Sequence, residues 1–416
     1  MTPTLPDLTR AFARIGLLSF GGPAAQIAMM HRDIVDDRKW ITEKDYLSAL
    51  SFCMLLPGPE AMQLATWIGW RKHGTIGGLI AGGLFVLPGA VIVLVLSVIY
   101  AEWGQVPVVA ALFTGVRAAV LAVVIEALLR VSKRALKSRA AWIIAASAFC
   151  ALFFFAMPFP AIILVAGFWG FASTSAAAAL PAPGPAPWRQ SLQAVVIWGA
   201  IWLLPLAYIT LMHPGILAEI AVFFSKLAVL TFGGAYAVLT WMAQDVVQKK
   251  GWLTLPQMID GLGLAETTPG PLILVTQFVA YLAAFKQGGV WMGVAGALIA
   301  LWMTFAPCFL WIFAGAPWIA RLTAAPRLSG ALQAITAAVV GVIANLSLWF
   351  GLHVLFATTT TFTAGPLQVL IPDFASLNVL TAALAVMAGY VLLGRHWPLP
   401  IVLGLCAAIT AAVAAF

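Results

Sequence analysis

The sequence is poor in charge. Only 9% of its 416 residues are Asp, Glu, Lys or Arg, whereas 63% are hydrophobic. A soluble protein of this length could not keep that much apolar surface out of water. We therefore expect an all-α polytopic membrane protein held in a lipid bilayer. Apolar runs of the length that crosses about 30 Å of hydrocarbon include 77–100, 106–129, 191–211 and 328–352.

Further absences exclude whole classes of function. The four cysteines stand singly, without the C-x-x-C spacing of a metal or redox site. The chain contains no P-loop, no H-E-x-x-H and no G-x-S-x-G motif. We expect no cofactor, no metal and no ATP hydrolysis, and a membrane-embedded enzyme is the least favoured alternative. Lys and Arg outnumber acids 22 to 14, but much of this excess lies in short loops, which indicates orientation and not nucleic-acid binding.

The chain contains one motif twice. "FARIGLLSFGGPAA" begins at Phe12 and "FSKLAVLTFGGAYA" begins at Phe224, 212 positions later. At the same offset, Trp40 matches Trp252 and a Pro-Gly-Pro triplet recurs. Self-similarity over such lengths indicates two homologous repeats. The predicted boundaries are a first repeat at 1–175, an Ala/Pro-rich linker with one extra transmembrane helix at 176–217, and a second repeat at 218–416.

Basic residues predict opposite orientations for the two repeats. The stretch "RVSKRALKSR", which we interpret as a loop, follows segment 106–129, and it contains five Lys or Arg. In the second repeat, Arg321 and Arg327 precede the equivalent segment, 328–352. Because basic loops stay in the cytoplasm, equivalent loops lie on opposite sides. Inverted repeats are typical of secondary transporters, whose site lies between the repeats at interrupted helices.

The duplicated motifs interrupt their apolar segments. Gly-Gly at 21–22 and Pro-Gly-Pro at 57–59 and 269–271 break the helical pattern, so we expect broken or re-entrant helices whose ends meet inside the membrane. A helix N-terminus there attracts anions. The alternative is that these motifs are packing or kink devices. The candidate anion-binding residues beside the breaks are Ser19, Gly21, Gly22, Gly58, Gln63, Thr231, Gly233, Gly234 and Gly270.

Two cations precede the glycine pairs. Arg14 and Lys226 each lie seven residues before the first glycine, on the same helical face as the break. We predict that they bind the anion electrostatically, although a charge near a helix end can also snorkel to the membrane surface. Arg71 and His73 are candidate entrance residues or, alternatively, topology anchors.

Two carboxylates flank the Pro-Gly-Pro triplets. Glu60 follows the first triplet and Glu266 precedes the second. Each can cap a helix N-terminus, or each can carry a proton if burial favours its neutral form. Both residues are therefore candidates for coupling protons to transport.

These motifs resemble the chromate ion transporter family in its two-domain form. The resemblance rests on "RIGLLSFGGPAAQ", "LPGPEAMQLATWIGW" and "TPGPLILVTQFVAYL", and Ala280 departs from an expected glycine. It implies two antiparallel domains in a bacterial inner membrane that export chromate and confer resistance. A sulfate or molybdate carrier and an anion channel are alternatives, and the chain can be a monomer or a homodimer.

The membrane potential favours export. A dianion that leaves a negative interior gains about 4.6 kcal/mol at 100 mV, enough for an outward gradient of about a thousandfold. We therefore expect efflux driven by the potential or by exchange with protons.

Overall fold

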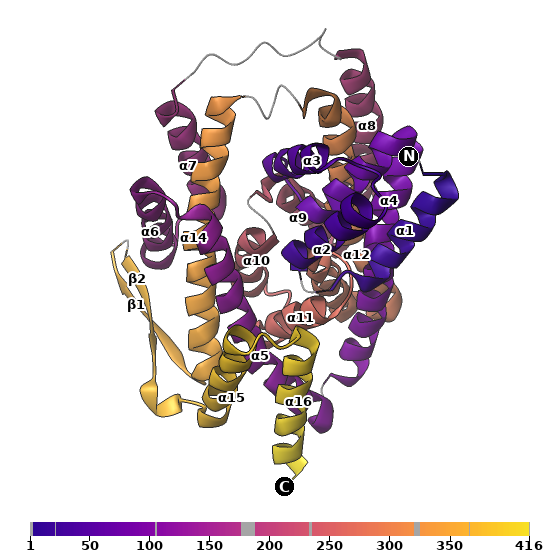
Figure 1. Ribbon diagram of the computed structural model, residues 1–416. Helices are drawn as coiled ribbons and strands as arrows, with labels where there is room; N and C mark the ends of the chain where they lie inside the picture. The colour runs from indigo at the N-terminus through magenta and orange to yellow at the C-terminus, as the bar shows by residue number, and fades with distance from the viewer. Residues whose placement is uncertain are drawn as a thin grey trace.

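The structure is a computed structural model that describes residues 3–20, 22–104, 106–175, 188–232, 235–319, 325–365 and 367–415. These residues form helices, apart from one antiparallel hairpin of β1 (Thr359–Ala364) and β2 (Leu367–Pro372). The hairpin lies beside α6 and α14, and the two termini lie far apart (Figure 1). The all-α expectation is confirmed.

The elements follow one another in two similar runs. The first run is α1 (Leu5–Leu18), α2 (Gly22–His31), the π-helical turn η1 (Arg32–Asp37), α3 (Glu43–Leu55), α4 (Glu60–Trp103), α5 (Pro107–Ala135), α6 (Arg139–Phe155) and α7 (Phe159–Ser173). The connecting helix is α8 (Trp188–Met212). The second run is α9 (Ile216–Leu230), α10 (Ala235–Gln244), the π-helical turn η2 (Asp245–Lys249), α11 (Leu255–Thr267), η3 (Leu272–Leu274), α12 (Val275–Gly315), η4 (Ala316–Trp318), α14 (Pro326–Leu355), the hairpin, η5 (Phe374–Ser376), α15 (Val379–Gly389), η6 (Tyr390–Gly394) and α16 (Leu399–Ala415).

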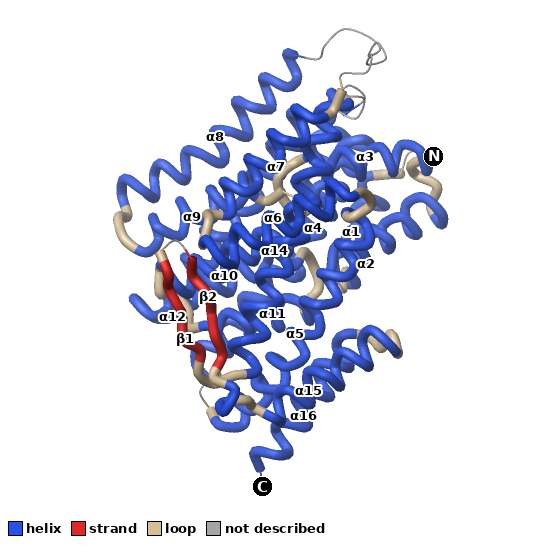
Figure 2. The backbone as a smooth tube through the Cα atoms, turned by 90° about the vertical axis from the view of Figure 1, so that its left-hand side faces the viewer, coloured by secondary structure: helices blue, strands red, loops and turns tan. Residues whose placement is uncertain are grey.

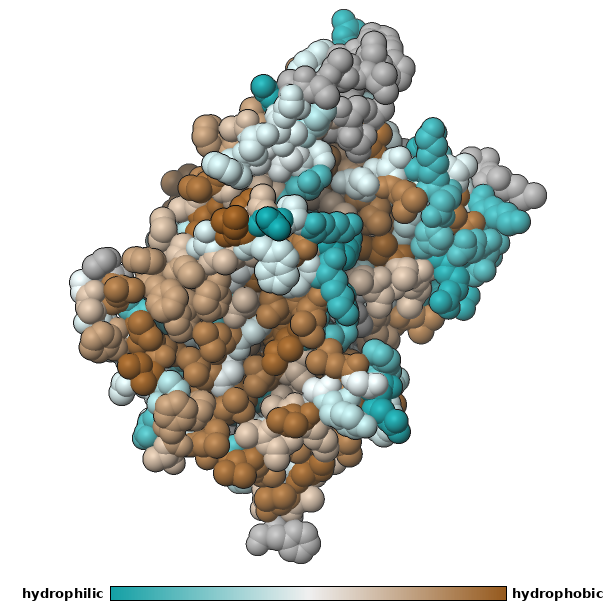
Figure 3. All heavy atoms as spheres, turned by 60° about the vertical axis from the view of Figure 1, so that its left-hand side comes forward, coloured by the Kyte–Doolittle hydropathy of each residue, from teal (hydrophilic) through white to brown (hydrophobic). Residues whose placement is uncertain are grey.

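Five stretches of helix in the described residues are long and apolar enough to cross a membrane. They contain the four apolar runs expected from the sequence, and α8 lies at the outer edge (Figure 2). Apolar residues cover most of the face drawn in Figure 3, and hydrophilic residues gather toward its upper right. The chain is a multi-pass membrane protein.

We expected the basic stretch after segment 106–129 to be a loop, but only residues 136–138 lie between helices α5 and α6. Helix α5 continues to Ala135 and includes Arg130, Lys133 and Arg134. Lys and Arg have good helix propensity, so the helix outlasts the apolar run. This correction places cations on a helical face, where they can contact other helices.

Helices α4 and α12 each fold back on themselves. The φ and ψ angles depart from helical values at His73 and Gly74 in α4 and at Gly288 and Gly289 in α12. In α4 the two limbs touch so closely that a Cβ on Gly69 would lie 2.1 Å from the Gly77 carbonyl oxygen. Each long helix is therefore a tight hairpin with a short first limb.

Several duplicated residues have the same local role in both halves. Thr42 and Thr254 are N-caps of α3 and α11, and each hydroxyl accepts a hydrogen bond from a backbone N–H three residues later. Lys39 and Gly251 occupy the same turn with φ of 52° and 61°. The repeated sequence thus encodes repeated caps and turns.

The two halves exchange packing partners. Helix α14 of the second half packs on α6 and α7 of the first, while α5 packs on α15 and α16. Helix α4 also packs on α12 (Figure 1). Residues of both halves therefore meet along the centre of the molecule.

The contact between α4 and the second Pro-Gly-Pro break generates a stability prediction. A Cβ on Gly89 would lie 2.0 Å from the Pro269 carbonyl oxygen, whereas a Cβ on Gly83 of the same helix meets nothing within 4 Å. Gly89→Ala should destabilise the protein by about 1–3 kcal/mol through overpacking. Gly83→Ala should be neutral or stabilise it by up to about 1 kcal/mol. Thermal unfolding in detergent measures both, and equal melting temperatures for the two variants would contradict this packing.

Candidate functional site between the two halves

The breaks of the two halves hold each other through backbone hydrogen bonds. The N–H of Gly58, in the first Pro-Gly-Pro, donates to the Thr231 carbonyl at the end of α9 (2.8 Å). Reciprocally, the N–H of Gly270 donates to the Ser19 carbonyl at the end of α1 (3.0 Å). Both glycines have positive φ, of 119° and 92°, which side chains rarely adopt. The duplicated glycines thus join each break to the opposite half.

Side chains satisfy further backbone groups of the breaks. The buried hydroxyls of Ser19 and Thr231 each donate to the carbonyl four residues earlier, at 2.6 Å. Gln26 Nε2 donates to the Gly270 carbonyl (2.6 Å), and Gln63 Nε2 donates to the Pro57 carbonyl (2.7 Å). These four side chains therefore stabilise interrupted backbone, and anion binding by Ser19, Thr231 and Gln63 stays a prediction.

A cavity of about 230 Å³ lies where the breaks meet α5, and we call it the arginine cavity. Residues of both halves contribute to its wall. Its lining residues are Pro23, Ala24, Ile27, Cys53, Met54, Leu56, Gly58, Glu60, Arg130, Val131, Arg134, Tyr236 and Thr336.

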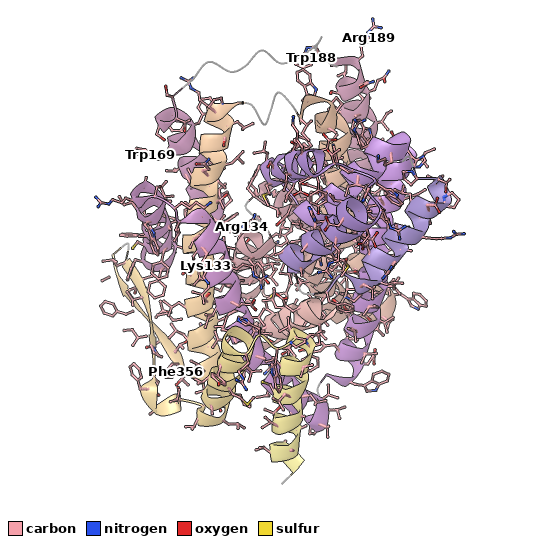
Figure 4. All side chains as sticks on the ribbon, viewed as in Figure 1. Lys133, Arg134, Trp169, Trp188, Arg189 and Phe356 are labelled. Atoms are coloured by element: carbon pink, nitrogen blue, oxygen red, sulfur yellow. The ribbon has the colours of Figure 1, made fainter. Side chains whose placement is uncertain are left out.

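Two arginines give the arginine cavity its charge. Arg130 pairs with Glu126 one helical turn earlier. Arg134 is exposed and makes no ion pair with any described residue; its guanidinium donates to the Met54 sulfur at 3.8 Å and interacts electrostatically with Glu60 of the same cavity. Figure 4 shows Arg134 near the centre of the molecule, between the α6, α7 and α14 group and helices α2 and α3. An unpaired guanidinium offers a fork of N–H donors that matches an oxyanion.

One carboxylate lines the arginine cavity and a second lies behind it. Glu60 is the first residue of α4 and lines the cavity, where its charge complements the helix N-terminus. Tyr236 also lines the cavity, and its hydroxyl donates to Glu266 at 2.7 Å. Glu266 is buried, and the hydroxyl of Tyr236 connects it to the cavity by one hydrogen bond. The structure thus brings both candidate proton carriers to the same site.

Other predicted residues lie away from this cavity. Arg14 and Lys226 are exposed on α1 and α9 and do not line it, so their role in binding stays a prediction. Arg71 is exposed, and His73 Nε2 donates to the Pro3 carbonyl at 2.8 Å. Both lie at the turn of the α4 hairpin.

The glycine pairs are described only in part. Gly21, Gly233 and Gly234 lie outside the described residues. Gly22 begins α2 with φ of 77°, and a Cβ there would lie 3.8 Å from the Tyr236 hydroxyl. The described part of the first glycine pair therefore borders the arginine cavity.

Arg130 and Arg134, which carry the positive charge of the site, were not predicted as site residues. Glu126, Arg130 and Arg134 follow one another at four-residue spacing, which places them on one helical face. This spacing indicates a helical face, but it begins where the apolar run of the segment ends. Orientation was the only meaning assigned to these cations.

An ion pair between α5 and α11 joins the two halves. The Arg117 guanidinium on α5 donates to both Asp260 carboxylate oxygens on α11, at 2.7 and 2.8 Å. Tyr100 of α4 donates to the same carboxylate at 2.7 Å. Asp260 is fully buried, so its charge is satisfied entirely by the first half.

The chemistry available here is recognition and movement of charge. The described residues contain no cluster of His, Cys, Asp or Glu that could hold a metal ion. Membrane transporters combine interrupted helices with a central cavity to which both halves contribute. This molecule has that arrangement, with a guanidinium at the cavity wall. The fold and the site therefore define a multi-pass membrane transporter.

Comparison with known proteins places this transporter in a family. The family model described as Chromate transporter matches residues 6–171 and 218–412, in both halves. The chain therefore belongs to the chromate transporter family. No solved structure matches it significantly.

Named relatives share most of their length with this chain. A chromate transport protein of Pseudomonas aeruginosa is 33% identical over 349 residues, which cover 81% of this chain and 79% of that protein. A chromate transport protein of Cupriavidus metallidurans is 30% identical over 356 residues, covering 82% and 81%. A probable chromate transport protein of Synechococcus elongatus is 30% identical over 344 residues, covering 82% and 83%.

The Arg117–Asp260 pair yields a prediction on stability. Asp260→Ala leaves a half-buried guanidinium unpaired and should cost about 3–5 kcal/mol. The double variant Arg117→Met with Asp260→Leu removes both charges and should recover most of that loss. Unfolding in detergent measures the effect. The matched control is Glu219→Ala, which breaks the more exposed pair with Lys250 and should cost at most about 1 kcal/mol. A loss in Asp260→Ala no larger than in the control would contradict the role of the buried pair.

Proposed function

We propose that this protein exports chromate from the cytoplasm across a bacterial inner membrane and so confers chromate resistance. The single observation that carries the proposal is the Arg134 guanidinium at the wall of a cavity between the halves. The names of the relatives support chromate as the anion.

The two halves act as inverted repeats in this proposal. The opposite order of basic residues supports that orientation. On this arrangement, the basic C-terminal end of α5 faces the cytoplasm, so the arginine cavity collects the anion from the cytoplasmic side. Rocking of one half against the other then exposes the site to the opposite side.

The driving force is electrical, with protons as the coupling ion. Export of a dianion from a negative interior is favoured by about 4.6 kcal/mol at 100 mV. Glu266 lies one hydrogen bond from the cavity through Tyr236, a path by which a proton can enter as the anion leaves. Glu60 lines the cavity directly and is the alternative carrier.

Transport in inside-out vesicles tests the proposed function. An inside-positive potential should drive labelled chromate into the vesicles, and Arg134→Ala should lower the initial rate at least about tenfold because a charge-assisted hydrogen bond is lost. Lys133→Ala removes the neighbouring exposed cation, which does not line the cavity, and should stay within about twofold of the parent.

The same vesicles also distinguish chromate export from the alternative functions. Absence of chromate accumulation under the imposed potential rejects export by this chain. Sulfate that competes more strongly than unlabelled chromate identifies a sulfate carrier, which binds a dianion of the same shape.

Proton coupling is tested by comparing Glu266→Gln with Glu60→Gln. Glutamine keeps the shape of the neutral acid but cannot release a proton, so the carrier's variant should lose uptake driven by a proton gradient between about pH 6 and 8. Uptake driven by the potential alone should persist. If both variants keep proton-driven uptake, neither carboxylate is the carrier. Glu102→Gln, at an exposed position, serves as the control.

A further inference from the structure

A second polar cavity lies outside the site described above. It encloses about 200 Å³ between the α6–α7 turn, helix α10 with η2, helix α14 and the β-hairpin. We call it the amide cavity, because four side-chain amides line it together with the Lys249–Asp245 ion pair (2.6 Å). These amides belong to Gln244, Gln248, Asn345 and Gln368.

Asn345 is a buried residue at the wall of this cavity. Only 3% of the residue is exposed, and its amide forms no hydrogen bond among the described residues. The amide is nevertheless not one of the fully buried polar atoms that lack a partner, so it reaches open space. An amide that faces a cavity completes its hydrogen bonds with a polar species in that cavity. Asn345 lines the amide cavity, so its partner is a polar species that occupies this cavity.

The two cavities lie at successive levels of one helical seam. Helices α10 and α14 pack together, and each lines both cavities. On α10, Tyr236 lines the arginine cavity and Gln244 lines the amide cavity. On α14, Thr336 lines the arginine cavity and Asn345 lines the amide cavity. At about 1.5 Å per residue, the two levels are about 12–14 Å apart.

The second level replaces charge by neutral donors. By the repeat, Asn345 occupies in α14 the place of Glu126 in α5, and Trp349 occupies the place of Arg130. The described lining contributes one cation, Lys249, which Asp245 neutralises. A dianion is therefore bound less strongly in the amide cavity than beside Arg134. Weak binding is what a release site requires, because a transport path must let its ion leave.

We propose that the amide cavity is a second station for a tetrahedral oxyanion, reached from the arginine cavity along the α10–α14 seam. This inference rests on the proposed function, because it takes the arginine cavity as the first station. Asn345 donates its amide N–H groups to the anion, and Gln244 is the second donor at this level.

Two measurements on the full chain separate the two stations. Equilibrium binding of chromate to protein in detergent reports the tighter arginine cavity, whereas the maximal rate in proteoliposomes also depends on passage and release. Asn345→Leu should lower the maximal rate about tenfold, because one hydrogen bond to a charged ligand is lost, and Asn345→Asp should lower it further by repulsion. The Kd for chromate should change less than about twofold in both variants, while Arg134→Ala should raise it.

The controls use the same helix and a second amide. Gln333→Leu alters an exposed residue of α14 and should leave both measurements unchanged, and Asn345→Gln should restore part of the rate. If the Asn345 variants fail to fold, Gln244→Leu carries the same expectation.

Three outcomes overturn one proposal or the other. A maximal rate within about twofold of the parent in the apolar and acidic Asn345 variants overturns the second station. A rise in their Kd equal to that of Arg134→Ala, with the rate preserved, also overturns it, since the two cavities then act as one site. Unchanged binding and transport in Arg134→Ala overturns the arginine site instead.

Discussion

The structure depends on one constraint: an interrupted helix inside a bilayer must find partners for its freed backbone groups within the protein. Here each half supplies the partner for the other. Gly58 donates to the Thr231 carbonyl, and Gly270 donates to the Ser19 carbonyl. Neither break can form with these hydrogen bonds in an isolated half. Reciprocal pairing of the backbone therefore accounts for the duplication of the Pro-Gly-Pro glycines.

This pairing creates the conditions for a site. Because the breaks meet at the centre, the adjacent helices cannot close fully, and a polar cavity remains beside Gly58 and Glu60. Helix α5 then brings Arg134 to the cavity wall, and α10 brings Tyr236 from the other half, with Glu266 behind it. Cation, hydroxyl and carboxylate come from separate segments. A change in the packing of the halves therefore changes all of their mutual distances, which is the property that an alternating transporter needs.

The sequence predicted the fold well where a local pattern was sufficient. Apolar length predicted the membrane helices, and proline with glycine predicted the breaks. It predicted the site only in part. Arg14 and Lys226 share a face with the glycines, yet they are exposed and do not line the arginine cavity. Arg134 lines it, although it lies more than 70 residues after the first break. A helical face indicates which residues point together, but not which other helix they meet.

The order of residues alone determines membrane insertion, the duplication, the caps at Thr42 and Thr254 and the position of each break. Hydropathy, backbone freedom and capping act within a few residues, so a local pattern is sufficient for these features. The partners of Asp260, the place of Arg134 at the cavity wall and the place of Asn345 beside the amide cavity follow only from how the helices pack. These features join segments far apart in the chain. Their energies come from burial and from contacts across the two halves, which no local pattern contains.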